Sequence, residues 1–576
     1  MDTLRRTVEA LEGLVWSSGI PVGDETIPFV VLALLGAGIY FTVRLGFLQA
    51  RRFGHGLAVT SGRYDDPDDP GDVNHFQALS TSLSATVGIG NIAGVAIAIH
   101  WGGPGALFWM WVTAFVGMAT KFTEVTLGQH YRTEEGPDGE AWAGTVSGGP
   151  MYYIERGLGR HWKPLAVFFA ICMAIAAFLG GNALQANTVA DVIETNFGLP
   201  VWITGFVTAT VVGLVILGGI TRIGQVTGIL APAMAGIYVL GALVILLLNW
   251  SEILPSFALI FREAFNPTAG VAGTGAGAFL LTLVWGVRRG LFSTEAGMGS
   301  SPIAHAAGKT REPVSEGSVA LMEPFIDTLV ICTMTALVII VTGSWGDPVP
   351  QEVQMTGGDL SYRAVDESGV FRTVDPPPEI EIVDGRHVET GAGAPLVAWH
   401  AAPLEDLFLD PDYSQPFTGS LFPDRGIAVT RDGQERESLY ALAVTNGAPL
   451  TMMAFRRGLQ PFGDFGHYIV LLTVVLFGVS TAIAWSYYGD RCINYLVGSK
   501  GLLPYKLAFV GMHFTGAVVP LMVAWSISDV LLGILILPNL IACGLLVGKV
   551  KELSRSYFAR QPWIEKGEAR RQRMGR

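Results

Sequence analysis

A run of small and polar residues interrupts one of the most apolar stretches of the chain. It reads Ser84-Ala85-Thr86-Val87-Gly88-Ile89-Gly90-Asn91-Ile92-Ala93-Gly94. Two glycines around one residue, followed by asparagine, form a poor helix, and backbone freed in the middle of a membrane must line a cavity. Exposed amides at such a break attract a carboxylate, and freed carbonyls attract a cation. A tight helix-packing face of small residues is the alternative, but nearby hydroxyls favour the polar cavity: Thr81, Ser82, Ser84 and Thr86.

A second apolar stretch carries two neighbouring hydroxyls that could hold a cation. Gly478-Val479-Ser480-Thr481 is followed one helical turn later by Trp485. Hydroxyl oxygens suit a hard cation such as sodium, because they ligate it without adding charge. The indole of Trp485 could form one wall of an apolar pocket. The alternative is that Ser480 and Thr481 hydrogen-bond back to carbonyls of their own helix.

Three side-chain amides lie on a further apolar stretch. Asn182, Gln185 and Asn187 follow the pair Gly180-Gly181. Lipid offers an amide no hydrogen-bond partner, so these side chains must face either a polar cavity or another helix. The sequence leaves both possibilities open.

Few acidic residues fall within or just after the apolar stretches, and three of them are candidates for coupling or gating. Asp327 lies inside one stretch. Glu124 lies near the end of another, where pairing with Lys121 or Arg132 is the simpler interpretation. Glu295 follows a further apolar stretch and could form a gating ion pair or cap a short helix.

Helices that cross a membrane must position these residues. The 576 residues are 50% hydrophobic and only 15% charged, whereas soluble proteins are about a quarter charged. A helix of about 20 apolar residues crosses the hydrocarbon core of a lipid bilayer. On that criterion eleven spans are predicted, at residues 28–43, 76–99, 104–127, 164–190, 200–220, 225–249, 271–287, 318–342, 466–488, 503–525 and 527–548.

The order of the spans predicts an inverted repeat. The second span holds the run at 84–94, and the seventh holds the glycines of residues 272–277, so each begins a set of five spans. Opposed five-helix halves that each open with a glycine-interrupted helix are typical of secondary transporters. The predicted fold is all-α and polytopic, with eleven transmembrane helices, the last ten forming a five-plus-five inverted repeat with discontinuous helices. The predicted segments are 1–27 (N-terminal), 28–47 (an extra helix), 75–250 and 271–548 (the two repeats), 346–440 (an insert) and 549–576 (a basic tail).

Lys and Arg gather in the loops after odd-numbered spans and in the tail, which places the N-terminus outside and the C-terminus in the cytoplasm of a plasma-membrane protein. The acidic insert at 346–440 is then extracellular. Alternation at 379–383 and the turn pairs Asp384-Gly385 and Asp432-Gly433 predict a small β-rich domain or a partly ordered loop. Residues 1–26 resemble an amphipathic surface helix.

Other function classes are disfavoured. A net charge of −12 argues against nucleic acid as a partner. The four cysteines have no CxxC spacing, which disfavours a zinc site or a disulfide framework. There is no HExxH or GxSxG motif, so an intramembrane enzyme is not expected.

Colinear motifs across the membrane part resemble the alanine or glycine:cation symporter family, also called sodium:alanine symporters. They include Val87-Gly88-Ile89-Gly90-Asn91-Ile92-Ala93-Gly94, Gly103-Pro104-Gly105-Ala106-Leu107-Phe108-Trp109, Gly148-Gly149-Pro150-Met151-Tyr152-Tyr153-Ile154, Gly181-Asn182, Glu295-Ala296-Gly297 and Trp485-Ser486-Tyr487-Tyr488-Gly489. The resemblance implies the eleven-helix fold of sodium-coupled amino-acid transporters, with alanine or glycine as substrate and sodium as coupling ion.

The resemblance also implies site residues. Sodium would be held by carbonyls of Ser84, Val87 and Phe477 and hydroxyls of Ser480 and Thr481. The substrate would lie among Gly88, Ile89, Gly90, Asn91, Gly181, Asn182, Gln185, Thr481 and Trp485. The family usually has threonine where Ile89 stands and asparagine where Thr294 stands, so substrate choice or affinity is expected to differ.

The predicted function is sodium-coupled symport of a small neutral amino acid into the cell by alternating access. The alternatives are proton coupling or another substrate on the same fold, and a membrane sensor that uses the extracellular insert. The predicted partners are the amino acid and the lipid bilayer.

Overall fold

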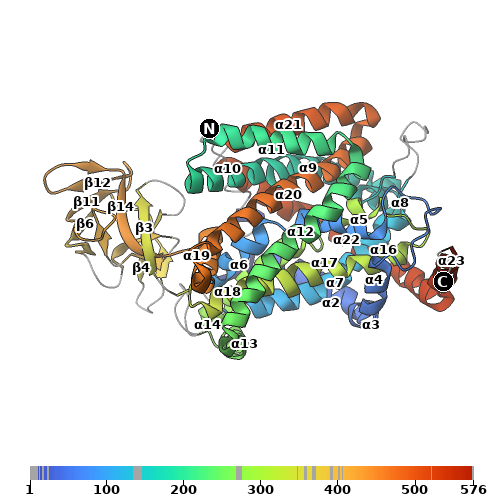
Figure 1. The fold of residues 1–576 in the computed structure, drawn as a ribbon, viewed down its shortest axis with the longest axis horizontal. Coiled ribbons are helices and arrows are strands. Elements are labelled where there is room, and N and C mark those ends of the chain that lie inside the picture. The colour runs from blue at the N-terminus through green and yellow to red at the C-terminus, as the bar shows by residue number, and fades with distance from the viewer. Residues whose placement is uncertain are drawn as a thin grey trace.

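Helices occupy the apolar spans, because a backbone surrounded by lipid must satisfy its own hydrogen bonds. The structure is a computed structural model that describes residues 11, 13–15, 18–22, 25–133, 146–267, 276–346, 348–355, 360–365, 371–388, 393–399, 402–404, 406–519 and 522–573. Residues 271–275, the first part of the predicted seventh span with Gly273 and Gly275, lie outside the described residues. Figure 1 shows a bundle of long helices with a β-rich insert at one end.

Each predicted span coincides with one helix or with consecutive helices. In chain order these are α2 (Phe29–Arg44); α5 (His75–Thr86), η1 (Gly90–Gly94) and α6 (Val95–Gly102); α7 (Ala106–His130); α9 (Lys163–Phe178), η3 (Leu179–Ala183) and α10 (Leu184–Phe197); α11 (Val201–Ile216); α12 (Gly219–Leu248); α14 (Ala276–Thr294); α16 (Pro313–Ala320), α17 (Met322–Pro324), η4 (Phe325–Cys332) and α18 (Thr333–Val341); α20 (Gly466–Val497); α21 (Leu502–Val518); and α22 (Met522–Arg560).

Shorter helices connect or flank the spans. They are α3 (Leu48–Arg51), α4 (Phe53–Thr60), α8 (Pro150–Leu158), η2 (Arg160–Trp162), α13 (Trp250–Phe265), α15 (Ser301–His305), α19 (Gly447–Gly458), η5 (Gln460–Phe462), η6 (Ser499–Gly501) and α23 (Trp563–Arg573). The sequence did not predict α13 or α19, because each mixes apolar residues with prolines and charges in fewer than 20 residues.

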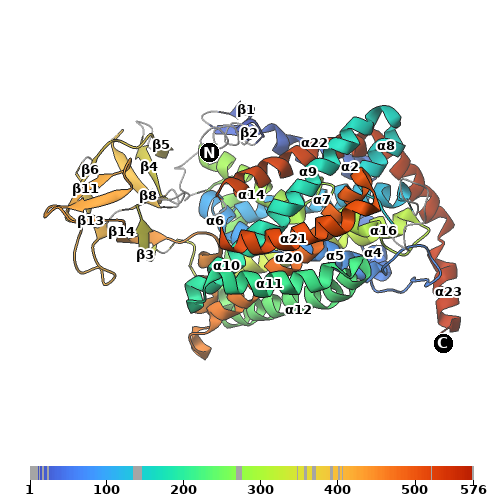
Figure 2. The same ribbon diagram turned by 90° about the horizontal axis from the view of Figure 1, so that it is seen from above.

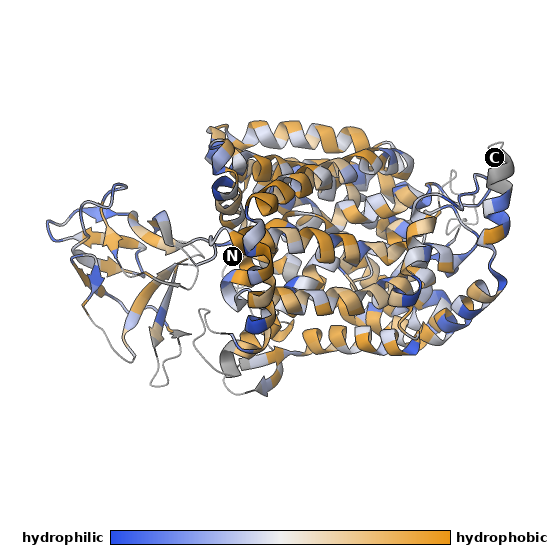
Figure 3. Ribbon diagram, turned by 60° about the horizontal axis from the view of Figure 1, so that its bottom comes forward, coloured by the Kyte–Doolittle hydropathy of each residue, from blue (hydrophilic) through white to orange (hydrophobic). Residues whose placement is uncertain are grey.

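The helical body has the surface of a membrane protein. Among the described residues, six helical segments, and a seventh if the bent pair α5 and η1–α6 counts as one span, are long and apolar enough to cross a membrane. Large apolar side chains such as Phe206, Leu214, Ile229, Leu240 and Leu247 are exposed on its outside, and Figure 3 shows the helices as the most apolar part of the molecule. The mostly helical membrane architecture is confirmed, whereas the count of eleven spans and the inverted repeat stay predictions.

The chain ends lie at opposite ends of the helical body. The N-terminal strand pair β1 (Gly19–Val22) and β2 (Glu25–Pro28) lies toward the end that carries the insert, and α23 lies at the other end (Figure 2). The strand pair replaces the last part of the helix predicted for residues 1–26, because Ile20 and Ile27 pair across an antiparallel ladder. Residues 1–10 lie outside the described part.

The insert is β-rich. Its strands are β3 (Pro348–Gln354), β4 (Leu360–Val365), β5 (Phe371–Thr373), β6 (Ile380–Val383), β7 (Arg386–His387), β8 (Pro395–Trp399), β9 (Ala402–Pro403), β10 (Leu407–Phe408), β11 (Gly419–Phe422), β12 (Ile427–Thr430), β13 (Glu435–Arg436) and β14 (Ser438–Val444). They form three antiparallel sheets with the strand orders β10-β14-β3, β13-β12-β11-β6-β7 and β5-β4-β8-β9. The predicted turn at Asp384-Gly385 joins β6 to β7 with positive φ at both residues, and Asp432-Gly433 joins β12 to β13.

The insert has an apolar core of its own. Alternate residues of β6, Ile380 and Ile382, are buried with Leu421 and Leu439 in a cluster separate from that of the helical body. Its two ends meet, because Pro348 at the start of β3 is the ladder partner of Val444 at the end of β14. The insert therefore leaves and rejoins the body at one point, between α18 and α19.

Candidate functional site

The predicted break in the second span is present. Helix α5 begins with a capping box in which the Asn74 side chain and Gln77 exchange hydrogen bonds with each other's backbone amides, and it ends at Thr86. Val87 leaves the helical conformation, with φ −75° and ψ 96°. The helix resumes at Gly90 with one π-helical turn, and the two parts are bent by 56°. The first N–H groups of the resumed helix and the last carbonyls of α5 therefore face each other across the break.

Asn91 holds the break in shape with both ends of its side chain. Its Oδ1 accepts a hydrogen bond of 2.8 Å from the Gly88 amide. Its Nδ2 donates to Asp327 Oδ1 at 2.6 Å and to Ser293 Oγ at 3.2 Å. Asp327 also accepts from Ser293 Oγ and, at 2.7 Å, from Thr328 Oγ1. Asp327, which the sequence offers for coupling or gating, is thus a buried acceptor beneath the broken helix.

The hydroxyl pair of α20 lies directly against the break. Thr481 Oγ1 donates to the Ser84 carbonyl at 3.0 Å, and Ser480 Oγ approaches the same oxygen at 3.4 Å. A Cβ on Gly88 would lie 3.1 Å from Thr481 Oγ1, so a larger residue at this position would crowd the approach. Phe477 is fully buried one turn earlier on α20. Neither hydroxyl follows the alternative of bonding to its own helix.

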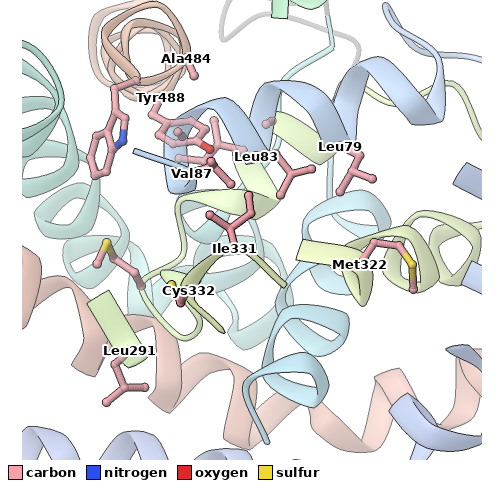
Figure 4. Packing of buried hydrophobic residues seen from close by; sticks show 14 of the residues in the cluster. Leu79, Leu83, Val87, Leu291, Met322, Ile331, Cys332, Ala484 and Tyr488 are labelled. Carbon is pink, nitrogen blue, oxygen red and sulfur yellow. The ribbon is translucent and has the colours of Figure 1, made fainter. Parts of the chain in front are cut away.

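Figure 4 shows the apolar packing around this point, with Leu79 and Leu83 on successive turns of α5, Val87 just after the end of that helix, and Tyr488 near Val87. All four side chains are buried. Within this packing, the hydroxyl of Ser84 is buried and has no hydrogen-bond partner among the described residues. An unpartnered polar atom in such a setting favours a bound polar ligand or ion over a merely packed interface.

Two of the three side-chain amides of the fourth span bond to another helix, and the third is left with an oxygen that is unpartnered within the described part of the chain and could face a polar cavity. The Asn182 side chain donates from Nδ2 to the Phe509 carbonyl at 2.8 Å, and its Oδ1 lies 2.7 Å from His513 Nδ1, both on α21. Asn187 also donates to α21, at the Gly516 carbonyl, 3.2 Å away. These two amides are helix-to-helix contacts. Gln185 differs, because its Nε2 donates within the span to the Gly180 carbonyl whereas its buried Oε1 has no partner among the described residues.

Trp485 packs against the same span. A Cβ on Gly181 would lie 2.3 Å from Trp485 Cγ, so the indole lies flush with the backbone of η3. The structure thus brings together Ser84, Gly88, Asn91, Ser480 and Thr481, and it places Trp485 with Gly181 one to two turns further along α20. Ile89 lies on the α20 side of the break, where its Cδ1 is 3.9 Å from the position that a Cβ on Gly478 would take.

A helix that the sequence did not predict covers the break from the insert side. Thr451 of α19 donates from Oγ1 to the Ile92 carbonyl at 3.0 Å. Beside α19, a cavity of about 1220 Å³ is bounded by α10, by the start of α20 and by Pro350 and Thr445 at the base of the insert. The break therefore lies beneath a short helix and near a large opening at one end of the molecule.

Glu124 differs from its predicted role. Its Oε2 accepts from Asn539 Nδ2 of α22 at 2.8 Å, whereas Lys121 makes its ion pair with Glu323, 3.0 Å away. Glu323 also accepts hydrogen bonds from the hydroxyls of Ser82 and Ser301. Glu295 accepts from Ser300 Oγ at 2.5 Å just after α14 ends.

Sequence reasoning missed the residues around Glu323. Glu316 and Glu323 are seven residues apart, a spacing that places them on one face of a helix, and this signal was present in the sequence. Their partners His75 and His305 come from other segments, which only the fold brings together.

Comparison with known proteins identifies the family. A model of the sodium:alanine symporter family matches residues 1–370 and 429–572. The chain belongs to the sodium:alanine symporter family. Residues 371–428, which the family model passes over, all belong to the insert. Membership makes the chain a membrane transport protein of a symporter family.

Individual relatives are similar in sequence to this chain over nearly its whole length. The chain is 39% identical over 546 residues to the sodium/alanine symporter AgcS of Methanococcus maripaludis, covering 94% of this chain and 96% of that protein. It is 34% identical to an uncharacterized transporter of Haemophilus influenzae, covering 97% of each. Among solved structures, that of MhsT in complex with L-phenylalanine covers 81% of this chain and 89% of the other, with a TM-score of 0.44 and 10% identity.

Proposed function

We propose that the protein carries alanine or glycine together with sodium into the cell, by alternating access around the break between α5 and η1. The observation that supports this most directly is the approach of Thr481 Oγ1 to the Ser84 carbonyl, 3.0 Å apart, where α5 ends. This contact places a pair of hydroxyls beside unwound backbone in the buried centre of a protein that belongs to a symporter family. Such a place can exchange a protein hydrogen bond for an ion contact, and the carboxylate of the amino acid bound beside it would balance the positive charge of the ion.

The donor set suits sodium. The carbonyls of Ser84, Val87 and Phe477 and the hydroxyls of Ser480 and Thr481 are neutral oxygen ligands, which fits a hard monovalent cation. When sodium is bound, the two hydroxyls turn from donating to the Ser84 carbonyl to presenting their lone pairs. The ion neutralises the dipoles of the last α5 carbonyls, so its binding favours a closed break.

The amino acid would bind beside the ion. Its carboxylate is attracted to the positive end of the helix that resumes at Gly90. Gly88 and Asn91 shape the backbone there, and the unpartnered Gln185 Oε1 offers an acceptor to the ammonium group. Gly181, Ile89 and Trp485 form apolar walls that leave room only for a small side chain. Asn182 contributes by fixing η3 against α21.

The orientation in the membrane follows from the positions of the Lys and Arg residues in the loops and the tail. We assign the end with the N-terminal hairpin and the insert to the outside, and the end with α23 to the cytoplasm, in a plasma membrane. The cavity beside α19 is then the outer access route, and α19 is the element that must move to expose the break.

The test is counterflow of labelled alanine in proteoliposomes, with and without a sodium gradient. Sodium-dependent accumulation is expected. Uptake that is indifferent to sodium would refute the coupling, and the absence of uptake for every amino acid in a panel of small ones would refute the substrate class.

Proton coupling on the same fold is the second candidate, because Asp327 lies buried beneath Asn91. Asp327→Asn separates the two candidates. A sodium-coupled carrier keeps sodium-dependent exchange in this variant with an unchanged pH profile, whereas a proton-coupled one loses its response to a pH gradient.

A further inference from the structure

A cluster of charged residues that the proposed transport site does not use lies toward the tail end of the helical body. His305, on the short helix α15, contacts two carboxylates at once. Its Nδ1 lies 2.5 Å from Glu316 Oε1, and its Nε2 lies 2.5 Å from Glu323 Oε1. All three side chains are buried, with exposures of 1% or less.

The geometry of this contact determines how many protons the three side chains share. A carboxylate is only an acceptor, and a neutral imidazole has one N–H and one bare nitrogen. Two imidazole nitrogens that both lie 2.5 Å from carboxylate oxygens therefore need one proton more than a neutral histidine and two carboxylates possess. Glu323 receives donors on both of its oxygens, from Ser82, Ser301 and Lys121 as well as His305. The additional proton thus belongs to the pair of His305 and Glu316.

The charges around the cluster lead to the same count. Glu316 and Glu323 carry two negative charges, and Lys121 supplies one positive charge at 3.0 Å from Glu323. One proton on His305 makes these four residues neutral, which removes the cost of an isolated buried charge. Glu124 and Glu295 also face Lys121, and their charge adds to the attraction for that proton.

A route leads from the cluster to the surface. His75, at the start of α5, contacts Glu316 through Nδ1, and its Nε2 lies 4.0 Å from Asp65 Oδ1, on a side chain that is 29% exposed. Lys566 of α23 lies close enough to act on His75. Within the part of the chain that the structure describes, no group of three or more His, Cys, Asp or Glu side chains is arranged to hold a metal ion.

We propose that His305, held between Glu316 and Glu323, is a proton-binding site that fills from the tail end of the molecule through Asp65 and His75. The bound proton links His305 of α15 to Glu323 of α17. Ser82 of α5 donates to the same carboxylate at 2.9 Å, so α5 is held to this pair. Ser82 is five residues before the break at Val87, so the site lies under the half of the broken helix that must move when the cytoplasmic side opens.

The site sets a pH dependence of stability. Burial lowers the pKa of His305, but the carboxylates of Glu323 and Glu316 outweigh burial and raise the pKa to about 9. A histidine whose pKa is higher in the folded than in the unfolded chain stabilises the fold fully below its ordinary pKa of about 6.5. That stabilisation is lost as the pH rises through about 9.

The first experiment measures the thermal midpoint of the purified full-length protein in detergent between pH 6.5 and 9.5. We expect the Tm of the natural sequence to fall by about 3 °C across this range. Glu316→Gln should abolish most of that fall. The Gln amide would donate to His305 Nδ1 and its oxygen would accept from His75. All the hydrogen bonds of the cluster can then form with a neutral His305, without an additional proton.

Two further variants complete the test. His305→Gln removes the titrating ring and should also flatten the Tm profile, even if it lowers the Tm at every pH. Glu312→Gln is the matched control, because Glu312 pairs with the exposed Arg560 and should retain the natural profile. If Glu316→Gln or His305→Gln follows the natural sequence in its pH dependence, the proton site is refuted.

The consequence for transport rests on the proposed function and is measured separately. Alanine exchange in proteoliposomes at equal sodium on both sides should respond to pH on the tail side with the midpoint of the Tm profile, and Glu316→Gln should lose that response. Absence of exchange at every pH would count against the transport function. The proton site would still stand or fall on the Tm profiles, which need no substrate.

Discussion

Two glycine-rich interruptions of similar composition have different outcomes in this molecule. Gly88-Ile89-Gly90-Asn91 ends one helix and starts another at an angle of 56°. Gly180-Gly181-Asn182 produces only a π-helical turn, η3, inside a helix that continues from Arg160 to Phe197. Glycine content alone therefore does not decide whether a membrane helix breaks.

The asparagine makes the difference. Asn91 turns its Oδ1 back onto the Gly88 amide at 2.8 Å, which replaces a helical backbone acceptor and stabilises the break. Asn182 turns outward, to α21, and leaves its own backbone in the helix. A side chain that competes for backbone hydrogen bonds opens a helix, whereas one that bonds to a neighbouring helix anchors it. We therefore expect the first interruption to bind ligand and the second to shape the pocket.

The largest effect is expected at the first interruption. Replacing Ser480 and Thr481 together with alanine removes the two hydroxyls that face the Ser84 carbonyl. We expect the sodium concentration for half-maximal uptake to rise at least tenfold, equivalent to about 1.4 kcal/mol. The measurement is alanine uptake as a function of sodium in proteoliposomes.

Thr473→Ala provides the control on the same helix, since its hydroxyl bonds only to carbonyls of α20 itself. It should leave the sodium dependence unchanged. A double variant that folds and keeps the natural sodium requirement would show that the break is not where sodium binds.

A smaller effect is expected at the second interruption. Gly181→Ala places a Cβ 2.3 Å from Trp485 Cγ, so the indole must move into the space assigned to the substrate side chain. The apparent affinity for alanine should fall several-fold, with glycine affected less because it is smaller, while the sodium requirement stays within about twofold. Competition of each amino acid against labelled alanine measures this.

Gly236→Ala is its counterpart in α12, where a Cβ would meet nothing within 4 Å, and it should behave as the natural sequence. If Gly181→Ala changed the sodium requirement as strongly as the loss of Ser480 and Thr481, the two interruptions would not have separate roles.

The sequence predicted the first interruption well, because glycine, asparagine and hydroxyls that occur together in an apolar span strongly favour a broken helix beside a polar cavity. It could not decide the direction of Asn182, since the partner carbonyl at Phe509 is more than 300 residues away along the chain. It overlooked α19, whose arginines and proline hide an apolar face that only packing reveals. In the cluster at His305, only the spacing of Glu316 and Glu323 could be read from the sequence, because the other titrating residues come from separate segments that only the fold brings together.

The smallest effect is expected from the insert, which touches neither interruption directly. Pro348 and Val444 are ladder partners, so their Cα atoms lie about 5 Å apart, and residues 349–443 can be replaced by Asn-Gly, a pair that closes a two-residue hairpin. The insert has its own buried core, so its removal should leave the helical body folded. We expect alanine uptake to stay within about twofold of the natural sequence.

The insert does connect to the break in one way, because β14 leads through Asn446 into α19, and Thr451 of α19 bonds to the Ile92 carbonyl. Thr451→Ala in the full-length chain removes that bond and leaves the insert in place. If the deletion abolishes uptake in a folded protein while Thr451→Ala does not, uptake depends on the insert itself. That result would favour a sensing role for the insert. If Thr451→Ala slows uptake and the deletion does not, α19 acts on the break without help from the insert.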